Sequence, residues 1–151
     1  HPEFGALVKA ECDRLGREVS ADELFGVFKK HYLEIPKKYE LRSHSFTEDA
    51  DTVRFQGVLL HDGVEQTISG EGNGPIDAFF NALKAVHMKA YEFVAYHEHA
   101  ISSGSDSKAI AYIQLKRPDG RPVFGVGIEN NINLASVQGV LCAINRAEAG
   151  E

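Results

Sequence analysis

The chain has 151 residues, of which 43% are hydrophobic and 25% charged, a composition typical of one soluble globular domain. Its net charge of −6 argues against a general nucleic-acid or anionic-membrane surface, and no apolar run approaches the ~20 residues that span a bilayer. The N-terminal residues His1-Pro2-Glu3-Phe4 are no signal peptide, and we expect the chain to be part of a longer protein. Two distant cysteines, Cys12 and Cys142, favour reduced core thiols and a cytoplasmic location.

Two helices are predicted before the first strand. Residues 4–15 place apolar side chains at helical spacing, and Gly16 is a plausible stop. Ser20 and Glu23 have the spacing of a capping box, which predicts a second helix through about His31. The two helices are interpreted as an adaptor that precedes the main domain.

Pro36 and the basic pair after it mark a boundary, so we divide the chain into residues 1–35 and a main domain at 36–151. From Tyr39 onward the apolar side chains follow the two-residue period of strands. The predicted order is strands at 39–48, 52–61 and 64–71, a helix from Pro75 to about Met88, strands at 91–101, 109–115 and 123–128, and a helix from about Leu134 to Arg146.

The second half of this pattern repeats the first at an offset of 57 residues. The repeat aligns turn, glycine and aromatic positions without a gap: Asp62-Gly63 with Asp119-Gly120, Gly70 with Gly127, Asn73 with Asn130, Ala78 with Ala135, Tyr39 with Tyr96, and Phe55 with Tyr112. Such an alignment is typical of a duplicated structural unit. The sequence therefore predicts an α+β fold of two βββα units around a pseudo-twofold axis, preceded by two short helices.

The stretch from Ser69 to Leu83 reads as strand, glycine loop and helix. Its glycines free the backbone to turn tightly, Pro75 suits the first helical position, and Asp77 in the first turn suits the helix dipole. The N–H groups of such a helix start can hold a small anion such as a carboxylate. Because the glycine spacing matches neither a Walker loop nor a dinucleotide fingerprint, an ordinary glycine-rich turn is the alternative.

Few residues elsewhere point to chemistry. His97 and His99 share one face of a predicted strand, but no third metal ligand is evident, so a pair of ordinary histidines is the preferred interpretation. The other face carries Tyr96 and Ala100, which could line an apolar pocket beside the glycine turn, and Ile132 occupies the equivalent turn of the second repeat. Core packing is the alternative for all three. The serine-rich stretch at 102–107 reads as a flexible polar loop, and no catalytic constellation is evident.

One set of motifs stands out along the chain: GEGNGPIDAFFNAL at 70–83, YHEHAI at 96–101, AIAYI at 109–113, GVGI at 125–128, Ala135-Ser136, and AINRA at 143–147. Together they resemble the C-terminal regulatory (dimerisation) domain of 2-isopropylmalate synthase and of its relative citramalate synthase. The resemblance covers about residues 36–148, and the helices at 4–31 resemble the end of the linker that joins this domain to a catalytic barrel.

This resemblance implies a homodimer that binds the end-product amino acid, leucine, for feedback inhibition. The effector-binding residues that it implies are Gly72, Asn73, Gly74, Ile76, Asp77, Phe93, Tyr96, Ala100 and Ile132. Backbone N–H groups of the glycine turn could hold the carboxylate of the amino acid, and Asp77 or nearby carbonyls its ammonium. An aliphatic side chain could then be surrounded by Phe93, Tyr96, Ala100 and Ile132.

The family's reaction, also implied only by resemblance, condenses acetyl-CoA with 2-oxoisovalerate on a TIM barrel that holds a divalent metal. None of the barrel's motifs is present, so we expect these residues to be inactive by themselves, with no catalytic residue, metal or other cofactor of their own. Two alternatives stay open: an isoleucine-binding domain of citramalate synthase, and a dimerisation module without an effector. A small metal-dependent enzyme using His97 and His99 is a third.

Overall fold

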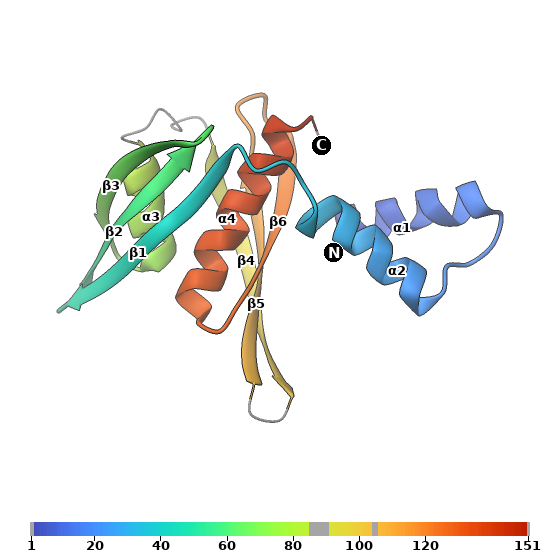
Figure 1. Ribbon diagram of the computed structural model, residues 1–151, viewed down its shortest axis with the longest axis horizontal. Helices are drawn as coiled ribbons and strands as arrows, with labels where there is room; N and C mark the ends of the chain where they lie inside the picture. Colours follow the sequence, from blue (N-terminus) through green and yellow to red (C-terminus); the bar gives the residue numbers. More distant parts are fainter. Residues whose placement is uncertain (1, 85–90, 104–105, 151) are drawn as a thin grey trace. The chain divides into compact units, whose positions relative to one another are not determined.

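The computed structural model describes residues 2–84, 91–103 and 106–150. The chain divides into two compact units, His1–Ile35 and Pro36–Glu151, which we describe separately (Figure 1). No helix in the part of the chain that the structure describes is long and apolar enough to cross a membrane.

The first unit is helical, with α1 at Pro2–Leu15, α2 at Ala21–Phe28 and the π-helix η1 at Lys29–Leu33. The predicted capping box is present, because Glu23 N donates to Ser20 Oγ and Ser20 N donates to the Glu23 side chain. The predicted second helix is confirmed, and after Phe28 it continues with π geometry as far as Leu33.

Aromatic side chains hold this wider turn in place. The rings of Phe28 and Tyr32 stack with centroids 5.5 Å apart, and Phe4 of α1 packs edge-on against both. The Tyr32 hydroxyl also donates to Glu3 Oε1 at 2.6 Å. Within the first unit, Phe28 of α2 and Tyr32 of η1 therefore both pack against α1.

The first repeat of the second unit is β1 (Tyr39–Asp49), β2 (Thr52–His61), β3 (Val64–Gly72) and α3 (Pro75–Lys84). The three strands form an antiparallel sheet in chain order, with α3 against β3 and β2. The turn between β2 and β3 is tight, since Asp62 and Gly63 both adopt positive φ. The predicted end of the helix at Met88 lies outside the described residues.

The second repeat is β4 (Glu92–Ser103), β5 (Asp106–Lys116), β6 (Pro122–Glu129) and α4 (Ile132–Glu148). Its sheet is also antiparallel in chain order, and α4 lies against β6 and β5. The predicted α+β fold of two βββα units is thus confirmed. Four residues of the serine-rich stretch, predicted as a loop, instead extend the two strands, because the pairs Ser102–Ser107 and Ser103–Asp106 continue the antiparallel ladder. The other two residues of that stretch lie outside the described residues.

The helices of the two repeats pack on their sheets in the same way. A Cβ on Gly70 would lie 2.5 Å from Ala78 O, and a Cβ on Gly127 would lie 2.7 Å from Gly139 N. Only glycine permits such close contact between strand and helix backbones. Because Ala78 and Ala82 of α3 correspond here to Ala135 and Gly139 of α4, the offset of 57 residues holds for the third strand and the helix of each repeat.

The predicted offset was wrong for the earlier strands. Phe55 of β2 is fully buried on the core face, and its counterpart in β5 is Ala111, also fully buried, rather than Tyr112. The reason is one extra residue in the second β-hairpin, whose turn at Arg117–Arg121 is longer than Asp62-Gly63.

The first strands differ by a larger shift. Leu41 pairs with Leu59 in the first sheet, and Phe93 pairs with Leu115 in the second, with a β-bulge following in each case. Tyr39, two residues before Leu41, therefore corresponds to Tyr91 and not to Tyr96 as predicted. Because the bulge occurs in both repeats, the shift comes from the longer β4–β5 hairpin, whose pairs Ser102–Ser107 and Ser103–Asp106 have no counterpart in β1–β2.

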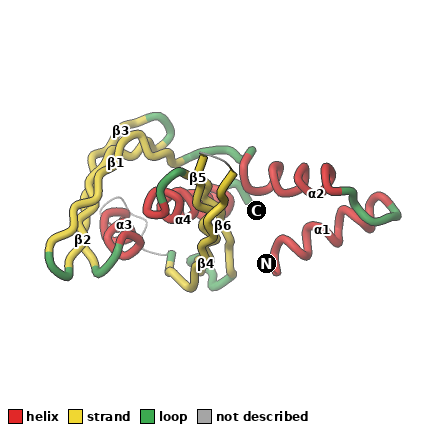
Figure 2. The backbone as a smooth tube through the Cα atoms, turned by 90° about the horizontal axis from the view of Figure 1, so that it is seen from below, coloured by secondary structure: helices red, strands yellow, loops and turns green. Residues whose placement is uncertain are grey.

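The core of the second unit lies around α4, which is buried on nearly all sides. Figure 2 shows α4 between the sheet β1–β3 and the sheet β4–β6, and α3 and α4 contact each other. Buried apolar side chains of both repeats form one cluster, which includes Phe55, Phe79, Ile113 and Leu141. Each repeat thus covers the apolar face of the other, as the duplication predicted.

Candidate functional site

The glycine turn between β3 and α3 is held by the first turn of the helix. Asn73 N donates to Asp77 Oδ2 at 3.0 Å, and Ala78 N donates to Gly74 O at 2.9 Å. A Cβ on Gly72 would collide with the Asp77 carboxylate. Asp77 therefore braces the turn, so one of its oxygens already has a backbone partner.

Further along α3, side chains divide between the sheet and an open face. Phe79 and Leu83 are buried in the core, whereas Ile76 and Lys84 line the cavity. Phe80, midway between Ile76 and Lys84, is buried in the core and also borders the cavity. Sequence reasoning grouped Ile76, Phe79, Phe80 and Leu83 into one apolar stripe. The structure divides that stripe between the core and a cavity.

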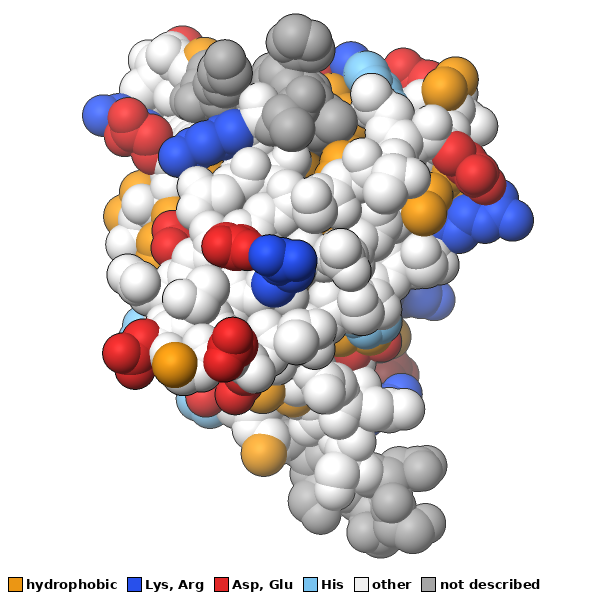
Figure 3. All heavy atoms as spheres, turned by 90° about the vertical axis from the view of Figure 1, so that its left-hand side faces the viewer, with side chains coloured by type: hydrophobic (Ala, Val, Ile, Leu, Met, Phe, Trp, Pro, Cys, Tyr) orange, Lys and Arg blue, Asp and Glu red, His pale blue; other side chains and the backbone are white. Residues whose placement is uncertain are grey.

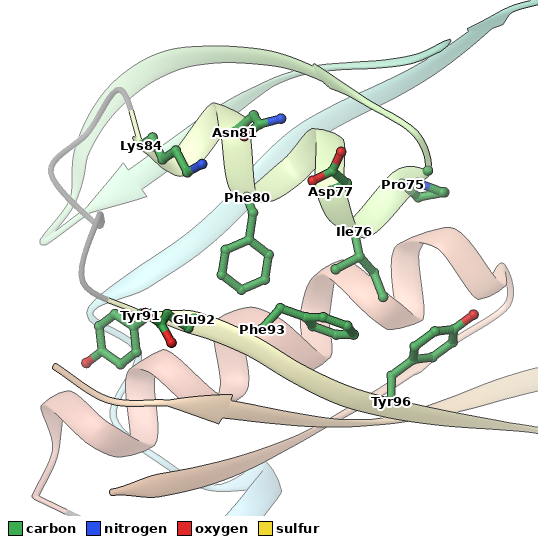
Figure 4. A pocket seen from close by; sticks show the side chains of 11 residues that line it. Pro75, Ile76, Asp77, Phe80, Asn81, Lys84, Tyr91, Glu92, Phe93 and Tyr96 are labelled. Atoms are coloured by element: carbon green, nitrogen blue, oxygen red, sulfur yellow. The ribbon is translucent and has the colours of Figure 1, made fainter. Parts of the chain in front are cut away.

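A β-bulge arranges the facing strand. Phe93 pairs with Leu115 and Tyr96 pairs with Ile113, while Val94 is passed over in the register. In a regular strand, residues three apart point to opposite faces, but the bulge restores Phe93 and Tyr96 to the same face. Both rings point toward α3 in Figure 4, where the Phe80 and Phe93 ring centroids are 6.2 Å apart.

Between α3 and the start of β4 lies a cavity of about 540 Å³ (Figure 4). Its wall comprises Gly74, Pro75, Ile76, Asp77, Phe80, Asn81, Lys84, Tyr91, Glu92, Phe93 and Tyr96. The structure thus brings together five of the nine residues named from the sequence, namely Gly74, Ile76, Asp77, Phe93 and Tyr96.

The other four predicted site residues lie outside the cavity wall. Gly72 and Asn73 belong to the glycine turn, where both lie against the Asp77 carboxylate. Ala100 is exposed, four residues beyond Tyr96 on the same face of β4, and Ile132 is the first residue of α4.

Six cavity residues were missed: Pro75, Phe80, Asn81, Lys84, Tyr91 and Glu92. Helical spacing from Ile76 and Asp77 gives Phe80, Asn81 and Lys84, so the signal was in the sequence. Tyr91 and Glu92 immediately precede Phe93 on the chain. They were missed because the start of β4 was read only as a strand.

The cavity combines an apolar wall with a few charged groups. Ile76, Phe80 and Phe93 supply the apolar surface, Asp77 lies in the first turn of α3, and Lys84 lies in its last turn. A concave apolar site with a few convergent polar groups is the usual form of a small-molecule pocket.

Tyr91 closes one end of the cavity and is tied to α4. Its hydroxyl donates to Glu148 Oε1 at 3.3 Å. Burial, together with the nearby Glu148 carboxylate, raises the pKa of Tyr91 to about 12. The ring borders the cavity while the hydroxyl points away from it, as Figure 4 shows.

Other regions offer less. His99 lies edge-on against Tyr112 with ring centroids 5.9 Å apart, and no group of three or more His, Cys, Asp or Glu side chains in the described ranges could hold a metal. On the face shown in Figure 3, acidic and basic side chains are mixed; ion pairs Arg42–Glu65 and Arg54–Glu71 lie on the first sheet. A nucleic-acid-binding surface would be predominantly basic.

Comparison with known proteins relates this chain to one family. The model of the LeuA allosteric (dimerisation) domain family matches residues 18–148. Three 2-isopropylmalate synthases are similar over nearly the whole chain: that of Clostridium acetobutylicum is 40% identical over 98% of the chain, and those of Pseudomonas entomophila and Corynebacterium efficiens are each 38% identical over 96%. The chain spans about a quarter of the length of these relatives, 27%, 26% and 25% respectively. It therefore belongs to the LeuA allosteric (dimerisation) domain family.

Proposed function

We propose that the cavity between α3 and β4 binds leucine, and that this domain mediates feedback inhibition of a 2-isopropylmalate synthase. The observation that carries the proposal is the pairing of an open helix start with an aromatic wall. Gly74 precedes Pro75 at the start of α3 and has no side chain that could cap the N–H groups of Ile76 and Asp77. Such groups suit a carboxylate.

The rest of the amino acid fits the remaining wall. Its ammonium would lie near the Asp77 carboxylate, whose Oδ2 also braces Asn73 N. Its aliphatic side chain would contact Ile76, Phe80 and Phe93, which form the apolar part of the wall. Burying a leucine side chain is favourable by about 1.5–3 kcal/mol, enough for selectivity over polar amino acids.

A second copy of the chain would complete the site. Phe93 and Tyr96 remain 41% and 47% exposed although they line the cavity, and Val94 between them is 49% exposed. Large apolar side chains gathered on one strand in this way mark an interaction surface. The proposal therefore places leucine at the interface of a homodimer in the cytoplasm.

The enzyme's chemistry would take place elsewhere. The chain spans about a quarter of its relatives, so the acyl transfer and its divalent metal are assigned to a catalytic barrel outside these residues. Binding at the cavity would reach that barrel as a coupling free energy of about 1–3 kcal/mol, if it is typical of allosteric proteins.

The test is thermal unfolding of this chain with leucine, isoleucine or valine. A ligand at ~100 times its dissociation constant that binds only the folded state adds about 2.7 kcal/mol to the free energy of unfolding. We expect a rise in melting temperature that is largest with leucine. A larger rise with isoleucine would assign the domain to citramalate synthase, and no rise on a folded dimer would leave dimerisation as its function.

Variants then locate the site. Phe93→Ala is expected to weaken leucine binding about tenfold or more, because it removes an aromatic wall of the cavity. Val64→Ala is the control, since Val64 is an exposed apolar residue on β3 that neither lines the cavity nor belongs to the proposed interface strand. Equal leucine affinities in the two variants, measured by calorimetry, would contradict this location.

A further inference from the structure

Glu148, in the last turn of α4, contacts two separate parts of the second unit. Its Oε1 accepts a hydrogen bond from the Tyr91 hydroxyl at 3.3 Å, and its Oε2 lies 3.6 Å from Lys38 Nζ. Tyr91 lines the cavity, whereas Lys38 belongs to the short connection between Ile35, where the first unit ends, and Tyr39, where β1 begins. One carboxylate thus joins the cavity wall to this connection.

The connection is also fixed by contacts that do not involve the cavity. Tyr39 N donates to Asn145 Oδ1 at 2.9 Å, and Asn145 Nδ2 donates to Tyr39 O at 2.8 Å. Asp62 N donates to Lys38 O at 2.9 Å. These bonds anchor the backbone where β1 begins. The Lys38 side chain, by contrast, is held by Glu148 and lies near the Tyr39 ring.

We propose that Tyr91, Glu148 and Lys38 form a relay through which occupancy of the cavity restrains the connection at 36–38. A ligand against the Tyr91 ring holds the ring in place, so its hydroxyl stays on Glu148. The carboxylate in turn stays on Lys38. The inference rests on the proposed function for the identity of the ligand, but not for the three contacts.

Two further observations support the relay. Tyr91 packs against the hydrophobic core, so its ring has few positions open to it, and its position determines that of its hydroxyl. Asn145 and Glu148 are three residues apart on α4 and therefore face the same side. Tyr39 and Tyr91, the equivalent tyrosines of the two repeats, are thus both held by one face of the last turn of α4.

Leucine titration of charge variants tests the relay through linkage. Coupling between two sites is reciprocal, so Lys38→Gln should weaken leucine binding by about twofold to fivefold, the range for a partly exposed ion pair. The same substitution should have no effect when Glu148→Gln is already present. Lys37→Gln is the matched control, because it removes the same charge from an exposed neighbour. Equal weakening by Lys38→Gln in both backgrounds would overturn the relay.

Trypsin cleavage after Lys37 and Lys38 tests the relay without a ligand. Tyr91→Phe should speed this cleavage at least twofold, because Glu148 loses one of its two partners. Tyr96→Phe is the control, as it removes a hydroxyl from the same cavity wall but lies outside the relay. Equal rates in the two variants would overturn the relay. If leucine fails to bind the unsubstituted chain, the proposed function fails, and the cleavage rates still decide the relay.

Discussion

The helices α3 and α4 begin at equivalent positions of the two repeats, yet their first turns differ. The side chain of Asn131 caps α4, accepting hydrogen bonds from Asn133 N at 2.8 Å and Leu134 N at 3.2 Å. The equivalent position before α3 is Gly74, which has no side chain. One helix start is therefore closed by its own chain, and the other is left available to a ligand.

Burial differs in the same direction. Residues on nearly every side of α4 are buried, so this helix is the centre of the second unit. Helix α3 buries the side that carries Phe79 and Leu83 and turns Ile76 and Lys84 toward the cavity. The comparison indicates how a duplicated unit can divide its roles: the core helix stabilises the fold, and under the proposed function its copy supplies the binding surface.

The largest expected effect concerns the contact between glycine and helix in each repeat. Gly127→Ala should lower the free energy of unfolding by about 3 kcal/mol or more, because the added methyl meets the backbone of a helix that is buried on nearly all sides. Gly70→Ala should cost about 1–2 kcal/mol, since α3 can move toward the cavity.

Urea unfolding of both variants measures this difference. Gly74→Ala serves as the control, because a Cβ there would meet open space. If Gly70→Ala proved as costly as Gly127→Ala, the two helices would be equally confined and the proposed division of roles would be wrong.

A pair of asparagines provides the next test. Asn145→Leu should lower the free energy of unfolding by about 2–3 kcal/mol, because it leaves the buried N–H and C=O of Tyr39 without partners. Asn81→Leu on α3 removes one exposed hydrogen bond, from Asn81 Nδ2 to Glu71 O, and should cost less than about 1 kcal/mol. Chemical denaturation of both variants measures their free energies of unfolding. Equal losses of stability would contradict the difference in burial between α4 and α3.

The capped and uncapped helix starts can be exchanged. Asn131→Ala should cost about 1 kcal/mol of stability, as expected for the loss of an N-cap. Gly74→Asn should give α3 the same cap, stabilise the domain by a few tenths of a kcal/mol, and weaken leucine binding about tenfold by occupying the N–H groups. Melting curves and calorimetry measure both quantities. Unchanged leucine affinity in Gly74→Asn would show that the helix start does not hold the ligand.

The smallest expected effect is a pH dependence in alkaline solution. The pKa of Tyr91 is about 12 in the folded chain, against about 10 when unfolded, so between these values the folded state retains a proton that the unfolded state loses. The free energy of unfolding should therefore fall as the pH rises through this window.

Tyr91→Phe should reduce this slope, as measured by melting temperatures at pH 9 to 11. Burial also raises the pKa of the equivalent Tyr39, but Lys38 opposes the shift there. Tyr39→Phe should therefore change the slope less, and the reverse order would contradict the assignment.

Much of the fold could be predicted from the sequence because its local signals are strong. The alternation in β2, the Asp62-Gly63 turn and the Ser20 capping box each have a local physical cause. The longer turn near Gly120 and the extra pairs Ser102–Ser107 and Ser103–Asp106 of the β4–β5 hairpin are different. They add residues to the second repeat alone, so an alignment of the two repeats without gaps misses them.

The candidate site was predictable only in part for a similar reason. Gly74, Ile76 and Asp77 follow from the local chemistry of a helix start. The positions of Phe93 and Tyr96 depend on how β4 pairs with β5, which no local signal determines. Phe80 has the helical spacing for both core and cavity. Whether a side chain of α3 contacts the core or the cavity depends on how the second repeat packs against this helix.

The position of α4 in the chain has a consequence for biosynthesis. The helix that forms the centre of the second unit is translated after both sheets, and its Asn145 closes a contact with Tyr39 across 106 residues. At ribosomal speeds of about 5–20 residues per second, the first sheet emerges roughly 4–15 s before α4 is complete. During that interval the apolar face of β2, including Phe55 and Leu59, must be shielded by α3 alone or by a chaperone.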